Sequence, residues 1–302
     1  MTPLGILRGV SFSSFRVRLT ATHDFAALAN TARNCYASNV GYMDSAMRQG
    51  NRMFAPMFET VNAAGTFSIN DLTVKGFEPY SEGGEGTGGE IIIKVLNKNG
   101  GIAVDEDGEK LSFSYWDNED TSEDGEGTGA GWYKDGYVSE DTKVTDVTFD
   151  VGQAFWVEGV DGRWITTAGG VKMTEAVIPA RQGNVGAGNP FPVARDLATE
   201  MYVTGYDSYD EGGDGTGGEI ILKVLNKNGG IDVDNDGRKM TWSFWDNEDT
   251  SDDGEGTGAG WYRDGYVSED TKVDDVSIPA GEGLWIEGVD SRWLHIKAPE
   301  LD

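Results

Sequence analysis

The chain has 302 residues and carries 52 acidic against 24 basic residues, for a net charge of −28. A field of that sign repels nucleic acid and anionic membranes and attracts cations and basic surfaces, so nucleic acid is excluded as a partner. Hydrophobic residues make up 38% of the chain and aromatic residues 11%, which is enough for folded cores, and the length suits two ordinary domains.

Residues 1–38 have no counterpart in the rest of the chain, and we expect them to form an N-terminal arm or leader. Residues 10–20 alternate apolar and polar in part, which favours a short strand, and residues 23–37 show helical spacing. Residues 1–70 hold six Arg against Asp24, Asp44 and Glu59, a local charge of +3. Because of this local positive charge, residues 1–38 are expected to dock on their own acidic chain or on a neighbouring copy.

Several features bear on location. The opening MTPLGILRGVSFSSFRVRLT is interrupted by Arg8, Arg16 and Arg18 and does not match a secretory signal as written. No stretch approaches the roughly 18 apolar residues of a spanning helix, so no membrane span is predicted. Cys35 is the single cysteine and has no internal disulfide partner. By analogy with acidic Ca²⁺-dependent modules, we expect an extracellular or cell-surface protein.

The main feature of the chain is a duplication. Residues 71–165 return without insertion or deletion as residues 200–294, and KVLNKNGGI at 94–102 is repeated in full at 223–231. The RQGN at 48–51 returns at 181–184, and its larger offset places a longer loop between Asn51 and Asp71 of the first copy. A fixed period of this kind indicates tandem units. The predicted division is an arm over 1–38, a first repeat over 39–170 and a second repeat over 171–302.

Within each repeat the pattern is that of short strands. Strands are predicted over 90–97, 110–116, 144–149 and 153–157, because each segment is β-branched or alternating and is bounded by Gly, Asn or Asp. Helical periodicity is absent from both copies. The prediction is therefore an all-β chain with two tandem antiparallel β-sandwich or small-barrel domains.

Alternating carboxylates before a glycine suggest a cation loop. Asp232, Asp234 and Asp236 precede Gly237 with the spacing of a calcium loop, although Ser243 stands where that pattern requires Glu. The first copy keeps only Asp105 and Asp107, because Ala103 replaces the first ligand. The alternative is a plain turn, since Asp-Gly is a favoured hairpin sequence. Both interpretations stay open.

A denser acidic insert follows in each repeat, without a basic neighbour. Two charges about 4 Å apart repel by roughly 1 kcal/mol in water, so such inserts splay, raise their carboxylate pKa values or recruit cations. The alternative is a solvated insert that keeps the protein soluble. Glu126 and Glu255 are the last acids of the two inserts. The candidate Ca²⁺ ligands are Asp117, Glu119, Asp120, Glu123 and Asp124 in the first copy, and Asp246, Glu248, Asp249, Asp252 and Asp253 in the second.

Other chemistry is poorly represented. Four acidic GxGTG segments occur, at 84–88, 125–129, 213–217 and 254–258, but they lack the Lys and helix start of a phosphate loop, so nucleotide binding is rejected. His23, His295 and Cys35 lie outside the duplicated set, and no hydrolase motif is present, so no enzyme activity is predicted.

The tryptophans recur in four matched pairs, 116 with 245, 132 with 261, 156 with 285 and 164 with 293. Tryptophan on a β surface can stack on sugar rings, whereas Trp156 and Trp285, in alternating strands, are expected to pack inward. Trp132 and Trp261 are expected to anchor the exit of the acidic insert in a core. A lectin-like function therefore stays open beside a purely structural role.

GQAFWVEGVDGRW at 152–164 and GEGLWIEGVDSRW at 281–293 resemble a set of uncharacterised bacterial secreted or surface β-repeat proteins. Their repeats end in a turn, a Gly-x-x-[Phe/Leu]-Trp-[Val/Ile] strand and a second short hairpin. The resemblance covers most of each repeat and brings no biochemical function. The acidic GxGTG inserts are elaborated here beyond that pattern.

These observations predict a non-enzymatic, calcium-binding structural protein for assembly or adhesion. The alternatives are a calcium-dependent carbohydrate-binding module pair and a virion, appendage or filament subunit. The expected partners are a second copy of the chain, glycans or basic protein surfaces.

Overall fold

The structure is a computed structural model, and it describes residues 40–47, 50–60, 65–76, 91–116, 130–134, 142–159, 162–206, 220–245, 259–263, 269–288 and 290–300. These residues are mostly β, in several antiparallel sheets with no closed barrel among them, which confirms the predicted all-β class at that level. The arm over residues 1–38 lies outside the described residues. No helix in the described part is long and apolar enough to cross a membrane.

The first repeat forms two larger sheets and a two-stranded ribbon. One sheet has the order β1-β11-β3, with β5 also paired to β11; the second has the order β2-β10-β6-β7-β8; and β4 pairs with β9. The elements are β1 (Val40–Ala46), β2 (Gly50–Phe54), β3 (Phe58–Glu59), β4 (Thr66–Ser68), the 3-10 turn η1 (Ile69–Asp71), β5 (Leu72–Lys75), β6 (Ile91–Lys94), β7 (Ser112–Trp116), β8 (Gly131–Lys134), β9 (Thr148–Asp150), β10 (Phe155–Gly159) and β11 (Trp164–Val171).

The second repeat follows the same plan. Its five-stranded sheet has the order β13-β20-β16-β17-β18, which matches β2-β10-β6-β7-β8 strand for strand, and its other sheets are β12-β21-β15 and β14-β19. The elements are β12 (Ala176–Ala180), β13 (Gly183–Gly188), β14 (Arg195–Asp196), α2 (Leu197–Glu200), β15 (Met201–Thr204), β16 (Ile220–Lys223), β17 (Thr241–Trp245), β18 (Gly260–Arg263), the 3-10 turn η2 (Glu269–Thr271), β19 (Ser277–Ile278), β20 (Gly283–Gly288) and β21 (Arg292–Ile296).

Each repeat has its own apolar core. In the first, the buried faces of β5, β6 and β10 alternate with outward residues, and Val74, Ile93 and Val157 point into a shared cluster. In the second, Val203, Leu222 and Ile286 occupy the corresponding places. Alternation with period two is what a half-buried sheet requires, and it explains why the strand prediction placed most of these elements within a few residues.

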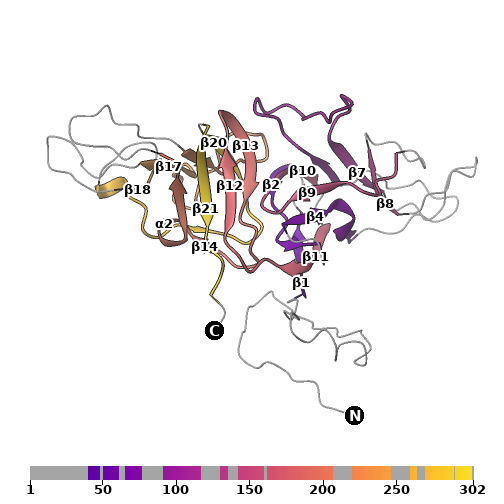
Figure 1. The fold of residues 1–302 in the computed structure, drawn as a ribbon, viewed down its shortest axis with the longest axis horizontal. Helices are drawn as coiled ribbons and strands as arrows, with labels where there is room; N and C mark the ends of the chain where they lie inside the picture. The colour runs from indigo at the N-terminus through magenta and orange to yellow at the C-terminus, as the bar shows by residue number, and fades with distance from the viewer. Residues whose placement is uncertain are drawn as a thin grey trace, which may run out of the picture.

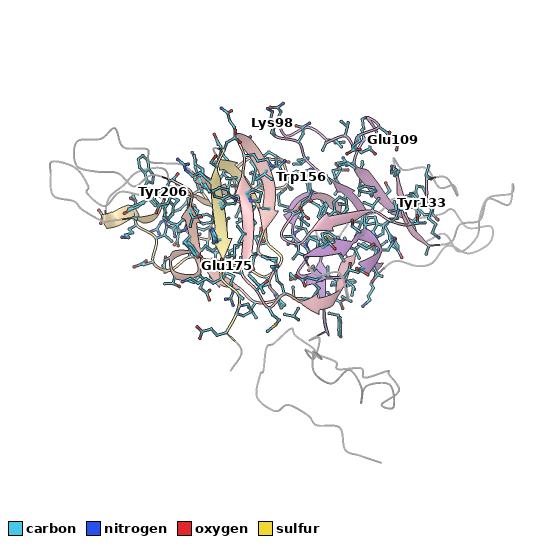
Figure 2. The ribbon with its side chains drawn as sticks, viewed as in Figure 1. Lys98, Glu109, Tyr133, Trp156, Glu175 and Tyr206 are labelled. Carbon is cyan, nitrogen blue, oxygen red and sulfur yellow. The ribbon has the colours of Figure 1, made fainter. Side chains whose placement is uncertain are left out.

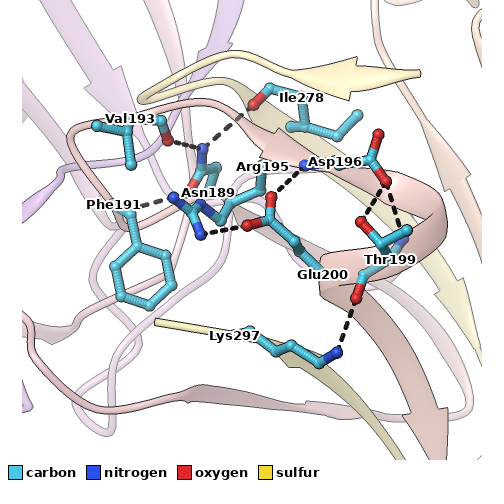
Figure 3. A network of polar contacts seen from close by, with 9 residues as sticks. All are labelled: Asn189, Phe191, Val193, Arg195, Asp196, Thr199, Glu200, Ile278 and Lys297. Carbon is cyan, nitrogen blue, oxygen red and sulfur yellow. Dashed lines mark hydrogen bonds and ion pairs between the residues drawn. The ribbon is translucent and has the colours of Figure 1, made fainter. Parts of the chain in front are cut away.

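The segment between Asn51 and Asp71, where the first copy is longer, is also where the repeats differ in structure. The first repeat has β3 here, which pairs through Phe58 and Glu59 with the end of β11. Among its described residues the second repeat has no such strand. There Asn189 is fully buried and donates to the carbonyls of Val193 at 2.8 Å and Ile278 at 3.2 Å (Figure 3).

A second polar group holds the short helix α2 beside this asparagine. Asp196 caps α2 by accepting from the Thr199 N–H at 2.8 Å. The buried Arg195 guanidinium contacts the Glu200 carboxylate at 2.7 Å, and the Asp196 N–H donates to the same carboxylate at 2.6 Å (Figure 3). The second repeat thus has this polar group where the first has, besides its own contacts among Thr60, Ser68 and Asp71, the added strand β3.

The two repeats lie side by side and meet through β2 and β10 of the first and β13 and β20 of the second (Figure 1). A small apolar cluster of its own fills this boundary, with Met53, Ala55, Ala154 and Trp285 buried. Trp156, which is labelled in Figure 2, packs against them. Strands β7 and β8 lie toward one end of the molecule, and β17 and β18 toward the other (Figure 1).

Candidate functional site

The densest acidic inserts, which the sequence singles out first, fall on residues 117–129 and 246–258, outside the described residues. The GxGTG segments at 84–88 and 213–217 also lie outside them. Of the candidate ligands, the structure describes Asp105, Asp107, Asp232, Asp234 and Asp236. The calcium assignment of the inserts therefore stays a prediction, and the geometry that follows is that of the alternating-carboxylate loops.

Asp234 and its counterpart Asp105 each hold a tight turn with one carboxylate oxygen. Oδ1 of Asp234 accepts from the N–H of Asp236 and the N–H of Arg238, both at 2.9 Å. Oδ1 of Asp105 accepts from the N–H groups of Asp107 at 3.1 Å and Glu109 at 2.9 Å. An aspartate that bonds its own backbone two residues ahead is the usual way in which such a side chain fixes a turn. The turn interpretation of this loop accounts for these contacts.

The other oxygen of each aspartate faces a basic side chain of the neighbouring strand. Oδ2 of Asp234 lies 3.6 Å from the Arg263 guanidinium, and Oδ2 of Asp105 lies 3.6 Å from the Lys134 ammonium. The backbone N–H of Arg238, followed by smaller contributions that include Arg263, holds the pKa of Asp234 below its ordinary value. The N–H of Glu109, with Lys134, does the same for the pKa of Asp105. Both carboxylates are thus held ionised beside a cation that the protein supplies itself.

The remaining carboxylates of these loops have fewer contacts. Asp107 and Asp236 are exposed, and Asp232 accepts from the adjacent Val233 N–H at 2.9 Å. Within the described ranges, no three His, Cys, Asp or Glu side chains form a group that could hold a metal ion. Asp232 and Asp236 are accordingly the residues at which a test of cation binding leaves the turn itself intact.

Three of the four matched tryptophan pairs lie in distinct environments, and the fourth pair, Trp116 and Trp245, is half-buried at the ends of β7 and β17. Trp132 and Trp261 are 1% exposed, and their indole N–H groups donate to the carbonyls of Leu72 at 2.8 Å and Met201 at 2.9 Å. Their predicted role as core anchors beside the acidic inserts is confirmed. Trp156 and Trp285 pack at the boundary between the repeats and not in either repeat's core cluster.

The third pair stays partly open to solvent. Trp164 is 40% exposed and Trp293 38%. One ring face of each covers a glycine of positive φ, Gly76 or Gly205, where a Cβ would lie 2.4 or 2.5 Å from the indole. Each repeat therefore presents a partly exposed indole, packed on a glycine, at the same position.

A groove of about 760 Å³ runs along the boundary between the repeats. Its walls include Lys98 and Gln153 of the first repeat and Arg181 and Asn184 of the second. The Asn184 side-chain N–H donates to the Lys98 carbonyl at 3.0 Å, while its Oδ1 is buried with no partner among the described residues. Neither repeat could form this groove alone.

A polar cluster on one sheet face of the second repeat escaped the sequence analysis. His295 lies 3.0 Å from the Glu175 carboxylate and 2.8 Å from the Thr204 hydroxyl, and its ring stacks on Tyr202 at 4.6 Å. Tyr202 donates to Glu175 at 2.6 Å, which lowers the pKa of Glu175 and raises that of the phenol. The sequence did contain a signal for this cluster, because Tyr202, Thr204 and His295 differ from their counterparts in the first repeat.

The first repeat places different residues at that position. Thr166 is the counterpart of His295, and its hydroxyl donates to Asp44, which also lies 3.2 Å from the Lys75 ammonium. The cluster around His295 therefore belongs to one repeat only, in contrast to the turns and the tryptophans.

No family model, curated protein or solved structure matches the chain.

Proposed function

We propose that the chain is a non-enzymatic, acidic structural protein of the cell surface or extracellular space, built of two sandwich units that take up Ca²⁺ and serve assembly or adhesion. One observation carries the proposal. The strands that flank the two acidic inserts lie toward opposite ends of one joined body (Figure 1). Two equal acidic elements set apart in this way suit a protein that links two partners.

The strands and buried tryptophans that flank the inserts support this proposal. Strands β7 and β8 pair directly before and after the first insert, as β17 and β18 do around the second. The buried Trp132 and Trp261 tie the exit of each insert to its core. When two sites cannot reach one target together, a second binding event must recruit another partner, so two sites at opposite ends favour bridging. Cations or basic protein surfaces are the chemistry that such inserts attract.

Calcium uptake is tested by the melting temperature. An ion that binds only the folded protein stabilises it by about 2.7 kcal/mol at a hundred times its Kd. The melting temperature should rise in millimolar Ca²⁺ and fall with chelator, while NaCl at equal ionic strength does much less because it screens without coordinating. No shift with Ca²⁺ in the parent would refute the metal assignment.

Matched variants locate the ions. Amide replacement of the acids in 117–126, or separately in 246–255, should each remove half of the calcium bound at saturation in a titration. Asp232→Asn/Asp236→Asn tests the alternating-carboxylate loop and leaves the Asp234 turn in place. If the double variant and the parent show the same calcium response, that loop is a turn and nothing more.

Assembly is tested on the same protein. Electron microscopy with and without Ca²⁺ should show linked particles only with the ion, and amide variants of either insert should give pairs at most. An ordered filament formed without Ca²⁺ would favour the alternative of a virion or appendage subunit.

The carbohydrate-binding alternative has its own observation in Trp164 and Trp293, which present matched, partly exposed indoles. Saccharides that stack on these rings should change tryptophan fluorescence, and Trp164→Ala or Trp293→Ala should each remove part of that change. Val233→Ala, at an exposed apolar residue elsewhere, is the control. Full retention of saccharide binding in the Trp164→Ala/Trp293→Ala double variant would exclude these rings as the site.

A further inference from the structure

Asn51 and Asn184, the last residues of the two RQGN sequences, each meet the KVLNKNGG segment of the other repeat across the boundary, and no predicted site uses these residues. The Asn184 side-chain N–H donates to the carbonyl of Lys98, and that of Asn51 donates to the carbonyl of Lys227, at 3.0 and 3.2 Å. Asn51 and Asn184 are counterparts, as are Lys98 and Lys227. In each repeat, therefore, the asparagine donates one hydrogen bond to the other repeat, and the lysine carbonyl accepts the equivalent bond from it.

The backbone contacts obey the same exchange. Gln153 forms an isolated antiparallel β-bridge with Ala187, and their counterparts Glu282 and Phe54 form the matching β-bridge. The N–H of Gly188 donates to Gly152 at 2.9 Å, as that of Ala55 does to Gly281 at 3.0 Å. Contacts in which i meets j′ and j meets i′ are the signature of a twofold, self-complementary interface. We call this interface the joint.

At the centre of the joint the twofold symmetry does not hold, because the matched side chains of the two repeats differ in size. Met53 of the first repeat corresponds to Gly186 of the second, and Ala154 corresponds to Gly283. A Cβ on Gly186 would lie 2.9 Å from the Ala154 carbonyl oxygen and 3.0 Å from the Met53 methyl. A Cβ on Gly283 would lie 2.6 Å from the backbone nitrogen of Phe54 and 2.7 Å from the carbonyl carbon of Met53. The first repeat offers a bulky face, and the second a glycine face that receives it.

Other pairings are disfavoured on packing grounds. If two first repeats paired, Met53 and Ala154 of one would lie against Met53 and Ala154 of the other, and the centre of the joint would be overpacked. If two second repeats paired, glycines would face glycines and leave a cavity there. Discrimination of this type rests on clashes against the wrong partner as well as contacts with the right one.

We propose that the joint is a directional pairing surface, by which the bulky face of a first repeat recognises the glycine face of a second repeat on the same chain or on another copy of it. Recognition does not require the connection through residues 172–175. Two chains that exchange repeats would keep both joints and form a closed dimer.

The first test cuts the connection in the full chain. A protease site inserted between the exposed Met173 and Thr174 leaves the contacts of Lys172 and Glu175 in place. Protein with an affinity tag on the first repeat is mixed with untagged protein, and both are cut and incubated. The tagged first repeat should retain untagged second repeats and no untagged first repeats. Capture of both kinds would refute directionality, and capture of neither, whether the separated halves are folded or unfolded, would refute autonomous pairing.

The second test exchanges the sizes. Gly186→Met and Met53→Gly should each weaken retention of the cut halves by about tenfold to a hundredfold, because one overpacks the joint and the other empties it. The double variant Met53→Gly/Gly186→Met moves the bulky side chain across the pseudo-twofold axis and should recover most of the loss. Gly170→Ala, where a Cβ meets only the Glu59 carbonyl oxygen at 3.8 Å, is the control. Losses that simply add in the double variant would contradict the proposed fit.

Discussion

The turns around Asp105 and Asp234 differ little between the repeats, whereas the faces through which the repeats meet differ in size at Met53, Ala55 and Ala154, whose counterparts in the second repeat are glycines. Each turn works inside its own repeat, with the same backbone contacts and a basic side chain at the same place. At the joint, by contrast, Met53 lies against Gly186 and Gly283. The comparison teaches that each repeat holds its turn with a matched aspartate, whereas the joint combines identical hydrogen bonds at its edge, through Asn51 and Asn184, with side chains of unequal size at its centre.

The sheet faces around Thr166 and His295 extend the comparison. Both positions lie in corresponding strands, β11 and β21, and each takes part in a polar cluster. The partners differ, because Asp44 and Lys75 stand in one repeat where the other brings Glu175 and Thr204 to the cluster. Because these faces lie outside the core, their chemistry can change without altering strand order.

The largest expected effect tests the equivalence of the two cores. Trp132→Ala and Trp261→Ala should each cost about 3–5 kcal/mol, since both delete a fully buried ring and a carbonyl's hydrogen-bond donor. Urea unfolding of both variants, with the exposed Trp164→Ala as control, measures the losses. A difference of more than about 1 kcal/mol between the matched variants would break the equivalence.

The joint should be the next most sensitive region. Gly283→Ala adds only one methyl group, but that group meets backbone atoms of the other repeat, so we expect a loss of about 1–3 kcal/mol. Gly170→Ala, within β11, should be close to neutral. Thermal unfolding measures both, and equal effects would mean that the glycine face is not size-limited.

The aspartate turns should show a smaller effect, alike in both repeats. Asp105→Ala and Asp234→Ala should lower the melting temperature, because each leaves two backbone N–H groups without an acceptor, while Asp107→Ala and Asp236→Ala should not. The folded pKa of Asp105 and Asp234 is depressed. Their contribution is therefore present above the unfolded pKa of about 3.9 and is lost as pH falls through the folded pKa. Variants lacking both aspartates should lose less stability on acidification than the parent does.

The smallest effect concerns the cluster that only the second repeat has. The Glu175 carboxylate raises the pKa of Tyr202. Stability from that contact is present below the unfolded pKa of about 10 and is lost as pH rises through the folded pKa. In Glu175→Gln, Tyr202 should ionise at lower pH than in the parent, as seen in the tyrosinate absorbance difference. An unchanged titration would show that the carboxylate does not control the phenol.

Local features could be predicted because they depend on neighbours in sequence. The predicted strand over 90–97 contains β6, and that over 110–116 contains β7, because β-branched alternation needs only one buried face. The Asp-x-Asp-Gly turn likewise forms from contacts within four residues. The burial of Trp132 was predicted from its place directly after a glycine-rich segment, and the residue lies in β8.

The sequence by itself determined the duplication, the all-β class and the turns, since strand periodicity and aspartate turns are local physics that each copy repeats. Only the tertiary structure decided that the matched Asn51 and Asn184 bond the KVLNKNGG segment of the other repeat. Their contacts join residues such as Asn184 and Lys98, which no periodicity relates. The tertiary structure also showed that Met53 lies against Gly186. The sequence shows only that the two copies differ at this position, and the fit between the two residues becomes visible when the two faces are in contact.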